Sequence, residues 1–164
     1  MANKTEVQQL IDQLNLSSHP EGGYFRETFR SSQKVRMDEQ ERSAATDIYF
    51  LLPAGVCTNW HRVCSDELWH FYKGDPLVLE VIDENGTLNQ QSLHNQRDAE
   101  TDFRGLVPAN CWQRAYSQGA YSLVGCIVAP GFEFEDFEMK EPEELAGQYP
   151  GIASDIKHNV FSSS

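Results

Sequence analysis

The segment from Gly55 to Gly74 contains the side chains best suited to acid–base chemistry. It holds an imidazole, His61, and a carboxylate, Glu67, with Val63 between them. Burial beside a carboxylate can move the pKa of a histidine into a catalytically useful range. A neutral imidazole oriented by a carboxylate can then take a proton from a carbon next to a carbonyl. Strand alternation would place Asn59 and Val63 on the same face as His61.

The elements that must position these residues are short strands. Apolar or alternating runs bounded by turn residues predict strands at 24–29, 45–52, 59–64, 67–72, 76–82, 105–108, 111–116, 121–129 and 132–139. Many short strands at near-regular spacing predict an all-β sandwich or barrel rather than β-α-β units. Thr5 and Gln8 can form a capping box, and the apolar residues that follow at helical spacing predict a helix over about residues 5–15. Polar residues 31–43 predict an exposed, mobile loop.

Composition excludes several classes of function. The chain has 164 residues, a net charge of −12 and 40% hydrophobic residues. An acidic surface disfavours nucleic acids and anionic membranes, whose binding needs Lys and Arg. The chain has no apolar run of membrane-spanning length and no basic, apolar N-terminal leader, so we expect a cytoplasmic protein with no membrane partner. The four cysteines form no C-x-x-C pair and predict small buried side chains.

The spacing of Gly55, His61, Glu67 and Gly74 matches the first cupin motif, G-x5-H-x-H-x3,4-E-x6-G, except that Val63 replaces the second histidine. The segment 108–113, PANCWQ, matches the second motif with Asn for glycine and Gln113 for histidine. Longer segments over about residues 10–139 resemble one branch of this superfamily, the uncharacterised cupin family 5, a domain of unknown function. They are HPEGGYFRETFRSS, IYFLLPAG, SDELWHFYKGDPL, VPANCWQ and LVGCIVAPGFEFEDF.

The resemblance implies one cupin domain over residues 1–164 with a jelly-roll β-barrel at about 20–139. The N-terminal helix at about 5–15 should pack outside the barrel, and residues 140–164 should form a loose tail with one helical turn at 141–147. Cupins are often dimeric and bind ligands at the barrel centre, so we expect a homodimer or higher homo-oligomer with a small polar molecule in the pocket.

The resemblance points His61, Glu67 and Gln113 into that pocket. Valine donates nothing and an amide oxygen is a weak ligand for transition metals, so we expect no cofactor. The alternative is a divalent metal ion held by His61 and Glu67 together with Gln113 or with a His70 that a β-bulge turns inward.

Metal-independent sugar-nucleotide epimerases of the cupin superfamily use a histidine base and a tyrosine acid. By resemblance, His61 is the candidate base, Glu67 its orienting partner, and Tyr24 or Tyr49 the acid. The side chains expected to bind substrate are a guanidinium, two amides and two aromatic rings: Arg26, Asn59, Gln113, Trp69 and Phe71.

Three functions stay open on the sequence. The first is a metal-independent isomerase or epimerase of a sugar-like or other polar carbonyl compound. The second is a weakly metal-binding enzyme, either an oxygenase or a metal-assisted isomerase. The third is a ligand-binding or storage module without turnover, in which His61 is a structural residue paired with Glu67 and Arg26 only makes surface ion pairs.

Overall fold

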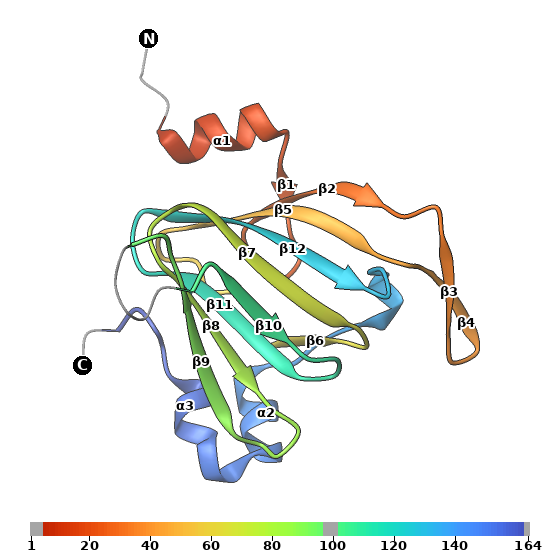
Figure 1. Cartoon of the computed structure of the whole chain (residues 1–164). Coiled ribbons are helices and arrows are strands. Elements are labelled where there is room, and N and C mark those ends of the chain that lie inside the picture. Colours follow the sequence, from red (N-terminus) through yellow and green to blue (C-terminus); the bar gives the residue numbers. More distant parts are fainter. Residues whose placement is uncertain (1–4, 97–101, 163–164) are drawn as a thin grey trace.

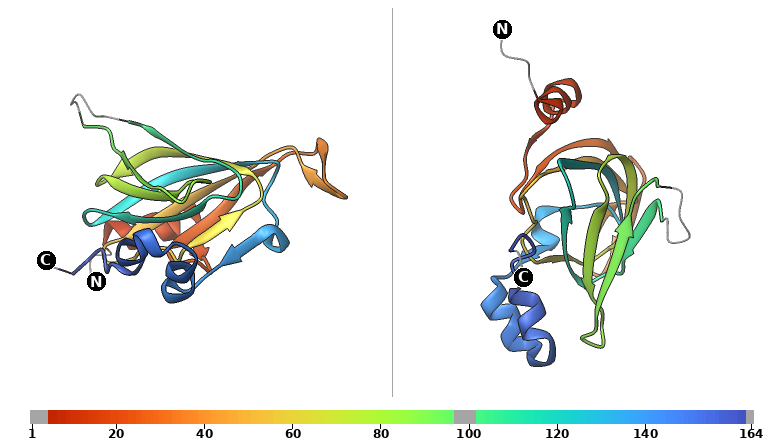
Figure 2. Two further views of the ribbon diagram at one scale, coloured as in Figure 1. Left: turned by 90° about the horizontal axis from the view of Figure 1, so that it is seen from below. Right: turned by 90° about the vertical axis from the view of Figure 1, so that its left-hand side faces the viewer.

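Two antiparallel sheets form the body of the protein and enclose its main core. The computed structural model describes residues 5–96 and 102–162. The larger sheet has the strand order β1-β2-β5-β12-β7-β10, and the smaller has the order β13-β6-β11-β8-β9. Viewed along the barrel, the two sheets curve around a common interior, and the helices lie outside (Figure 2). This architecture confirms the predicted all-β jelly roll with an external N-terminal helix.

The strands of the larger sheet supply most of one wall. Their bounds are β1 Ser17–Ser18, β2 Tyr24–Arg30, β5 Thr46–Pro53, β7 Asp66–Gly74, β10 Arg104–Val107 and β12 Tyr121–Ala129. The register of β2 against β5 shifts between Glu27 and Phe29. Near its end, this strand therefore changes which of its residues face inward.

The smaller sheet closes the other side of the interior. Its strands are β6 His61–Val63, β8 Leu77–Ile82, β9 Leu88–Leu93, β11 Trp112–Ser117 and β13 Phe137–Met139. Every residue of β8 is buried, because one face of this strand contacts the core between the sheets and Ile82 contacts the C-terminal helices. The β8–β9 hairpin turns at Gly86, which has a φ of 76°, and Asp83 Oδ1 accepts hydrogen bonds from the backbone of Asn85 and Thr87.

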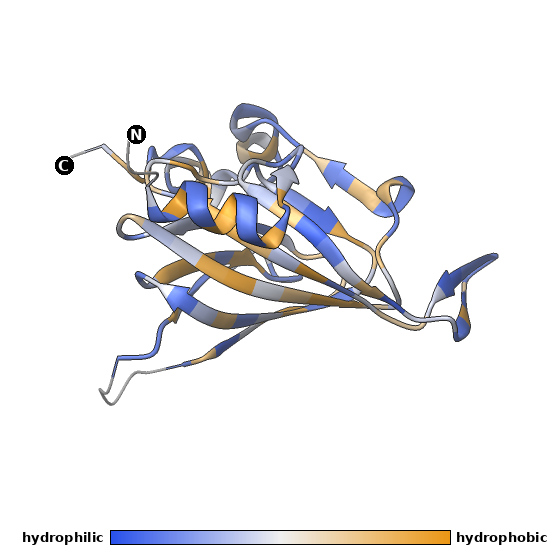
Figure 3. Ribbon diagram, turned by 90° about the horizontal axis from the view of Figure 1, so that it is seen from above, coloured by the Kyte–Doolittle hydropathy of each residue, from blue (hydrophilic) through white to orange (hydrophobic). Residues whose placement is uncertain are grey.

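Helix α1, Glu6–Leu14, packs on the outer face of the larger sheet (Figure 1). Thr5 caps it by accepting a hydrogen bond from Gln8 N, and Asn15 ends it in the left-handed conformation. Apolar and polar residues alternate along its turns (Figure 3), and the apolar side joins Leu51, Tyr121 and Leu123 in one cluster. Within the residues that the structure describes, no helix has the length and apolar character needed to cross a membrane.

Two segments differ from the sequence-based expectation. Residues 31–43 contain a β-hairpin, with β3 Lys34–Met37 and β4 Gln40–Ser43, that projects from the barrel (Figure 1). The predicted loop is therefore wrong, because cross-strand pairing organises a mostly polar segment whose buried residues, Arg42 and Ser43, are themselves polar. The predicted strand at 132–139 is a short 3-10 turn, η1 Phe134–Asp136, followed by β13.

The C-terminal segment is also more regular than the loose tail expected. It forms α2 Pro142–Gln148, η2 Pro150–Ile152 and α3 Ala153–Lys157. These short elements pack on Trp60, Ile82 and Trp112, on the outside of the smaller sheet. Tertiary burial therefore holds helices that are too short to be stable alone.

Candidate functional site

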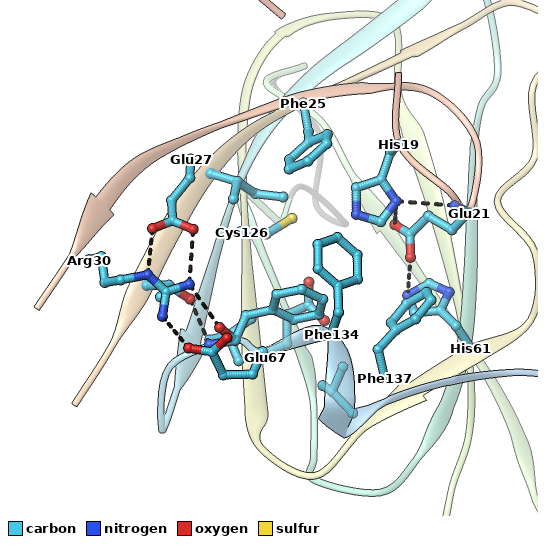
Figure 4. A pocket seen from close by; sticks show the side chains of 16 residues that line it. His19, Glu21, Phe25, Glu27, Arg30, His61, Glu67, Cys126, Phe134 and Phe137 are labelled. Atoms are coloured by element: carbon cyan, nitrogen blue, oxygen red, sulfur yellow. Dashed lines mark hydrogen bonds and ion pairs between the residues drawn. The ribbon is translucent and has the colours of Figure 1, made fainter. Parts of the chain in front are cut away.

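A cavity of about 90 Å³ lies between the two sheets at one end of the barrel. A space of this size holds several water molecules or one small organic molecule. Strands β2, β5, β6, β7 and β12, the turn before β2 and the segment 132–137 contribute the lining (Figure 4). The lining residues are His19, Glu21, Phe25, Glu27, Arg30, Thr46, Ile48, His61, Val63, Glu67, Cys126, Val128, Phe132, Glu133, Phe134 and Phe137.

His61 lies at the polar end of this cavity and is only 2% exposed. Its Nε2 lies 2.9 Å from Glu21 Oε2, and its Nδ1 lies 2.8 Å from the carbonyl oxygen of Asn59. Both ring nitrogens therefore face acceptors, an arrangement that favours the imidazolium form. Burial alone would lower the pKa of His61, but the charge and hydrogen bond of Glu21 outweigh it and raise the pKa to about 8.

Glu67 is the second buried acid–base group. Its Oε2 accepts a hydrogen bond of 2.7 Å from Gln113 Nε2, and Gln113 is fully buried. Burial disfavours the carboxylate and raises the pKa of Glu67 to about 7, although the positive charge of His61 opposes this shift. Burial also raises the pKa of the neighbouring Cys126 thiol well above its ordinary value. Glu67 therefore exchanges a proton near neutral pH.

Glu21, which the sequence analysis did not select, is the direct partner of His61. Burial alone would raise its pKa, but the attraction of His61 keeps that pKa below its ordinary value. Glu21 belongs to a tight turn in which Gly22 N donates to the His19 carbonyl. Gly23, with a φ of 77°, has no room for a side chain, because a Cβ would lie 2.7 Å from the Leu51 carbonyl oxygen.

His19 packs against the same carboxylate. Its Nδ1 accepts a hydrogen bond of 3.1 Å from the backbone N–H of Glu21 and lies 3.9 Å from Glu21 Oε1. Burial lowers the pKa of His19, so this imidazole is neutral where His61 is charged. The segment HPEGG therefore supplies two lining residues. The sequence signal for this part of the site was an acid and an imidazole beside paired glycines. The paired glycines predicted only a turn.

The predicted tyrosine acids do not line the cavity. Tyr24 and Tyr49 pack with helix α1 on the opposite face of the larger sheet. Arg26 is exposed on that face, with its guanidinium carbon 5.8 Å from the centre of the Tyr49 ring. The expected inward face of β2 is therefore wrong, because Phe25 and Glu27 are the residues that reach the cavity.

The predicted stacking and amide groups are also displaced from the cavity. Trp69 and Phe71 are buried in the main core, where Trp69 contacts the Phe50 ring at 5.9 Å. Asn59 is exposed and contributes only its carbonyl oxygen, which contacts His61. Gln113 lies behind Glu67 and positions it. Of the predicted set, His61 and Glu67 line the cavity, while Glu21 occupies the partner position that was assigned to Glu67.

Arg30 lies at the opposite side of the cavity from His61 (Figure 4). Its Nε and one terminal nitrogen donate to the two carboxylate oxygens of Glu27, at 2.8 and 3.0 Å. The other terminal nitrogen donates to Glu133 at 2.7 Å, and the Phe132 carbonyl oxygen accepts a further bond of 2.9 Å. All three nitrogens of this guanidinium therefore already have acceptors.

The side chains considered as metal ligands, His61, Glu67 and Gln113, have contacts within the protein. Across residues 5–96 and 102–162, no group of three or more His, Cys, Asp or Glu side chains is arranged to hold a metal ion. The alternative ligand set of His61, Glu67 and Gln113 is internally engaged, since both nitrogens of His61 face acceptors and the Gln113 amide donates to Glu67. His70 is not among the lining residues, so no bulge brings it to this site.

The two sheets and the cavity between them define a cupin-type barrel, with the polar groups at one end of its interior. More particularly, the chain belongs to the family described as Cupin superfamily (DUF985). The model of this family matches residues 8–140. The assignment to this uncharacterised branch of the cupins is therefore confirmed.

Related proteins share the fold along nearly the whole chain. A hypothetical protein from Leishmania major is 35% identical with a TM-score of 0.85, over 94% of this chain and 97% of its own. A protein from Shewanella oneidensis is 34% identical with a TM-score of 0.84, over 94% and 96%. An uncharacterized protein from Saccharomyces cerevisiae is 24% identical over 85% of this chain and 78% of its own. Oxalate decarboxylase from Bacillus subtilis shares the fold. It is 14% identical, with a TM-score of 0.56, over 86% of this chain and 36% of its own.

The two buried groups predict how stability depends on pH. We expect the free energy of unfolding to fall by on the order of 3 kcal/mol between about pH 5 and pH 9. The pKa of Glu67 rises from 4.5 to about 7 on folding, and that of His61 rises from 6.5 to about 8. The folded state therefore binds these protons more tightly, and the stability they contribute is lost as the pH rises through about 7 and then about 8.

Urea denaturation at a series of pH values measures this dependence. The Glu67→Gln variant serves as the control, because it should lose the part of the decline centred near pH 7 and retain the part near pH 8. Superimposable pH profiles for the variant and the parent protein would show that Glu67 does not titrate in this range.

Proposed function

We propose that this protein is an isomerase that moves a proton between neighbouring carbons of a small α-hydroxy carbonyl compound. One observation carries the proposal: His61, held by Glu21, lines the same cavity as Glu67, a buried acid without a formal ion pair among the described residues. An acid and a base whose pKa values are set by their surroundings are the usual means of proton transfer near neutral pH.

The roles differ from those expected from the sequence. Because both nitrogens of His61 face acceptors and its pKa is about 8, the imidazolium suits an acid that donates to a carbonyl oxygen. Glu67, with a pKa of about 7, suits the base. Glu21 keeps His61 charged and oriented, which is the part that the sequence analysis gave to Glu67.

In the proposed reaction, the Glu67 carboxylate takes the proton from the carbon next to the carbonyl. The electron pair of that C–H bond forms a C=C bond. The His61 Nε2–H exchanges its hydrogen bond to Glu21 for one to the substrate and gives its proton to the carbonyl oxygen, which yields an enediol. Glu67 then returns its proton to the neighbouring carbon, and the hydroxyl on the original substrate carbon returns a proton to His61. Both groups end as they began, and no oxidant or reductant is consumed.

A single base on one side of the substrate supports isomerisation better than epimerisation. Inversion at one carbon requires a second acid on the opposite face, and the expected tyrosines, Tyr24 and Tyr49, pack on the other side of the sheet. Apolar side chains of the lining, such as Ile48, Val63 and Val128, support exclusion of water from the reacting atoms.

Solvent-deuterium exchange tests the proposal. Hydroxyacetone and related α-hydroxy carbonyl compounds in D₂O should gain deuterium at carbon, followed by proton NMR. The rate should rise with pH through about 7 as Glu67 ionises and fall above about 8 as His61 loses its proton. A chain that binds these compounds without accelerating exchange would instead be a binding module, and the proposal would be wrong.

A further inference from the structure

We infer that the cavity selects a small positively charged molecule, an amine or quaternary ammonium compound, and excludes carboxylates and phosphates. This inference rests on the proposed function, because it names the class of substrate that the same site would accept. Its test measures binding and not turnover.

The charges that line the cavity favour a cation. Four carboxylates line it, against one guanidinium and two imidazoles: Glu21, Glu27, Glu67 and Glu133 against Arg30, His19 and His61. Arg30 is bound to Glu27 and Glu133, and His61 to Glu21. With His19 neutral, the lining keeps a net negative charge whether or not Glu67 is protonated. An anion would enter without a free cationic partner, at a large desolvation cost.

Aromatic rings also line the cavity. Phe132, Phe134 and Phe137 contact one another edge to face, with ring centres 5.0 to 6.2 Å apart, and the His19 ring lies 6.3 Å from Phe134. Rings packed in this way turn their faces in different directions, and Phe134 is 54% exposed. The electron-rich face of an aromatic ring attracts an ammonium group, by about 0.5–2 kcal/mol.

The buried end also holds two carboxyl groups, those of Glu21 and Glu67, among the lining residues. Their oxygens can accept hydrogen bonds from an amine and attract a quaternary ammonium group. The net charge of −12 further attracts cations and repels phosphates at long range. The nucleotide substrates of related epimerases are therefore a poor match.

Three probes of almost equal shape test the charge preference. Choline carries a positive charge, 3,3-dimethylbutan-1-ol replaces its nitrogen by carbon, and 3,3-dimethylbutanoate is the corresponding anion. Titration followed by ¹H–¹⁵N NMR gives each dissociation constant and places the probe in the structure. We expect choline to bind at least about 10-fold more tightly than the alcohol, with shifts at the cavity residues, and the carboxylate to bind more weakly than either.

Matched variants separate the ring and charge effects. Phe134→Leu should weaken choline binding several-fold more than it weakens binding of the alcohol. Phe103→Leu is the control, since Phe103 is 57% exposed and lies outside the lining. Glu27→Gln removes a carboxylate and loosens Arg30, so it should reduce the preference for choline over the carboxylate.

The inference is overturned if the carboxylate binds as tightly as choline, if choline causes no shifts at its highest soluble concentration, or if Phe134→Leu and Phe103→Leu behave alike. These results are distinct from failure of the proposed function. Choline binding without deuterium exchange in any carbonyl compound would reject the isomerase and retain the charge preference. Deuterium exchange combined with tighter binding of anions would retain the isomerase and reject the preference for cations.

Discussion

Replacing Glu67 by glutamine should reduce the rate of solvent-deuterium exchange by about 10²–10⁴-fold. Glutamine has nearly the same shape as glutamate and can still accept the hydrogen bond from Gln113 Nε2. It cannot take a proton from carbon, so the loss should fall on the catalytic rate constant, while ligand affinity changes little. Proton NMR of the substrate in D₂O measures the rate, and a binding titration on the same samples measures the affinity.

Two further variants make this prediction specific. Tyr24→Phe alters a residue on the outer face of the same barrel and should leave exchange unchanged. Glu21→Gln should retain Glu67 but lower the pKa of His61, because it removes the charge that raises it. The alkaline limb of the pH–rate profile should then move to lower pH. A Glu67→Gln protein with undiminished exchange would eliminate Glu67 as the base.

Replacing Arg114 by alanine should destabilise the protein by about 3–5 kcal/mol, measured by urea denaturation. Arg114 is 5% exposed and forms a short ion pair with Glu80, which is 4% exposed. Its terminal nitrogens also donate to the carbonyl oxygens of Asp155, Ile156 and His158 at the end of α3. The variant leaves a buried carboxylate without its cation and frees the C-terminal helix from the sheet.

Arg36→Ala is the matched control, because Arg36 pairs with Glu39 on the projecting hairpin, where the side chains are 76% and 93% exposed. That substitution should cost less than about 1 kcal/mol. The double variant Arg114→Met, Glu80→Gln should recover part of the stability, since it removes the uncompensated charge. An equal effect of Arg114→Ala and Arg36→Ala would show that the buried pair does not fasten the helices.

Much of the fold could be predicted, because local patterns and burial agree over the central strands. Turn residues bound the strands, and the left-handed conformation of Asn110, with a φ of 65°, shows why Asn can replace the motif glycine. The helix at 6–14 lies within the range inferred from its cap and apolar spacing. The inward positions of His61 and Glu67 followed from the motif rather than from alternation alone.

The rest depended on information that is not local. Alternation in β2 defines two faces but does not say which one is inside, and the core on both sides of this sheet accepts aromatic residues. Thus Tyr24 and Arg26 were assigned to the wrong side. The pairing of Glu21 with His61 depends on a turn that folds back over the barrel, and no spacing rule connects these distant residues. Likewise, the C-terminal helices are stabilised by tertiary contacts with Trp60 and Trp112.

The turn that carries Glu21 also has a practical consequence for shortening the chain. Its backbone is joined to the barrel, since Asn59 N donates to the Glu21 carbonyl and His19 N to that of Gly23. Trimming the gene so that the product starts at β2 would preserve every strand of the smaller sheet, yet it would delete both His19 and the anion that holds His61. Such a shortened domain would also lose helix α1 and uncover the apolar cluster of Leu51, Tyr121 and Leu123. The N-terminal segment therefore stabilises the sheet as well as completing the acid–base site.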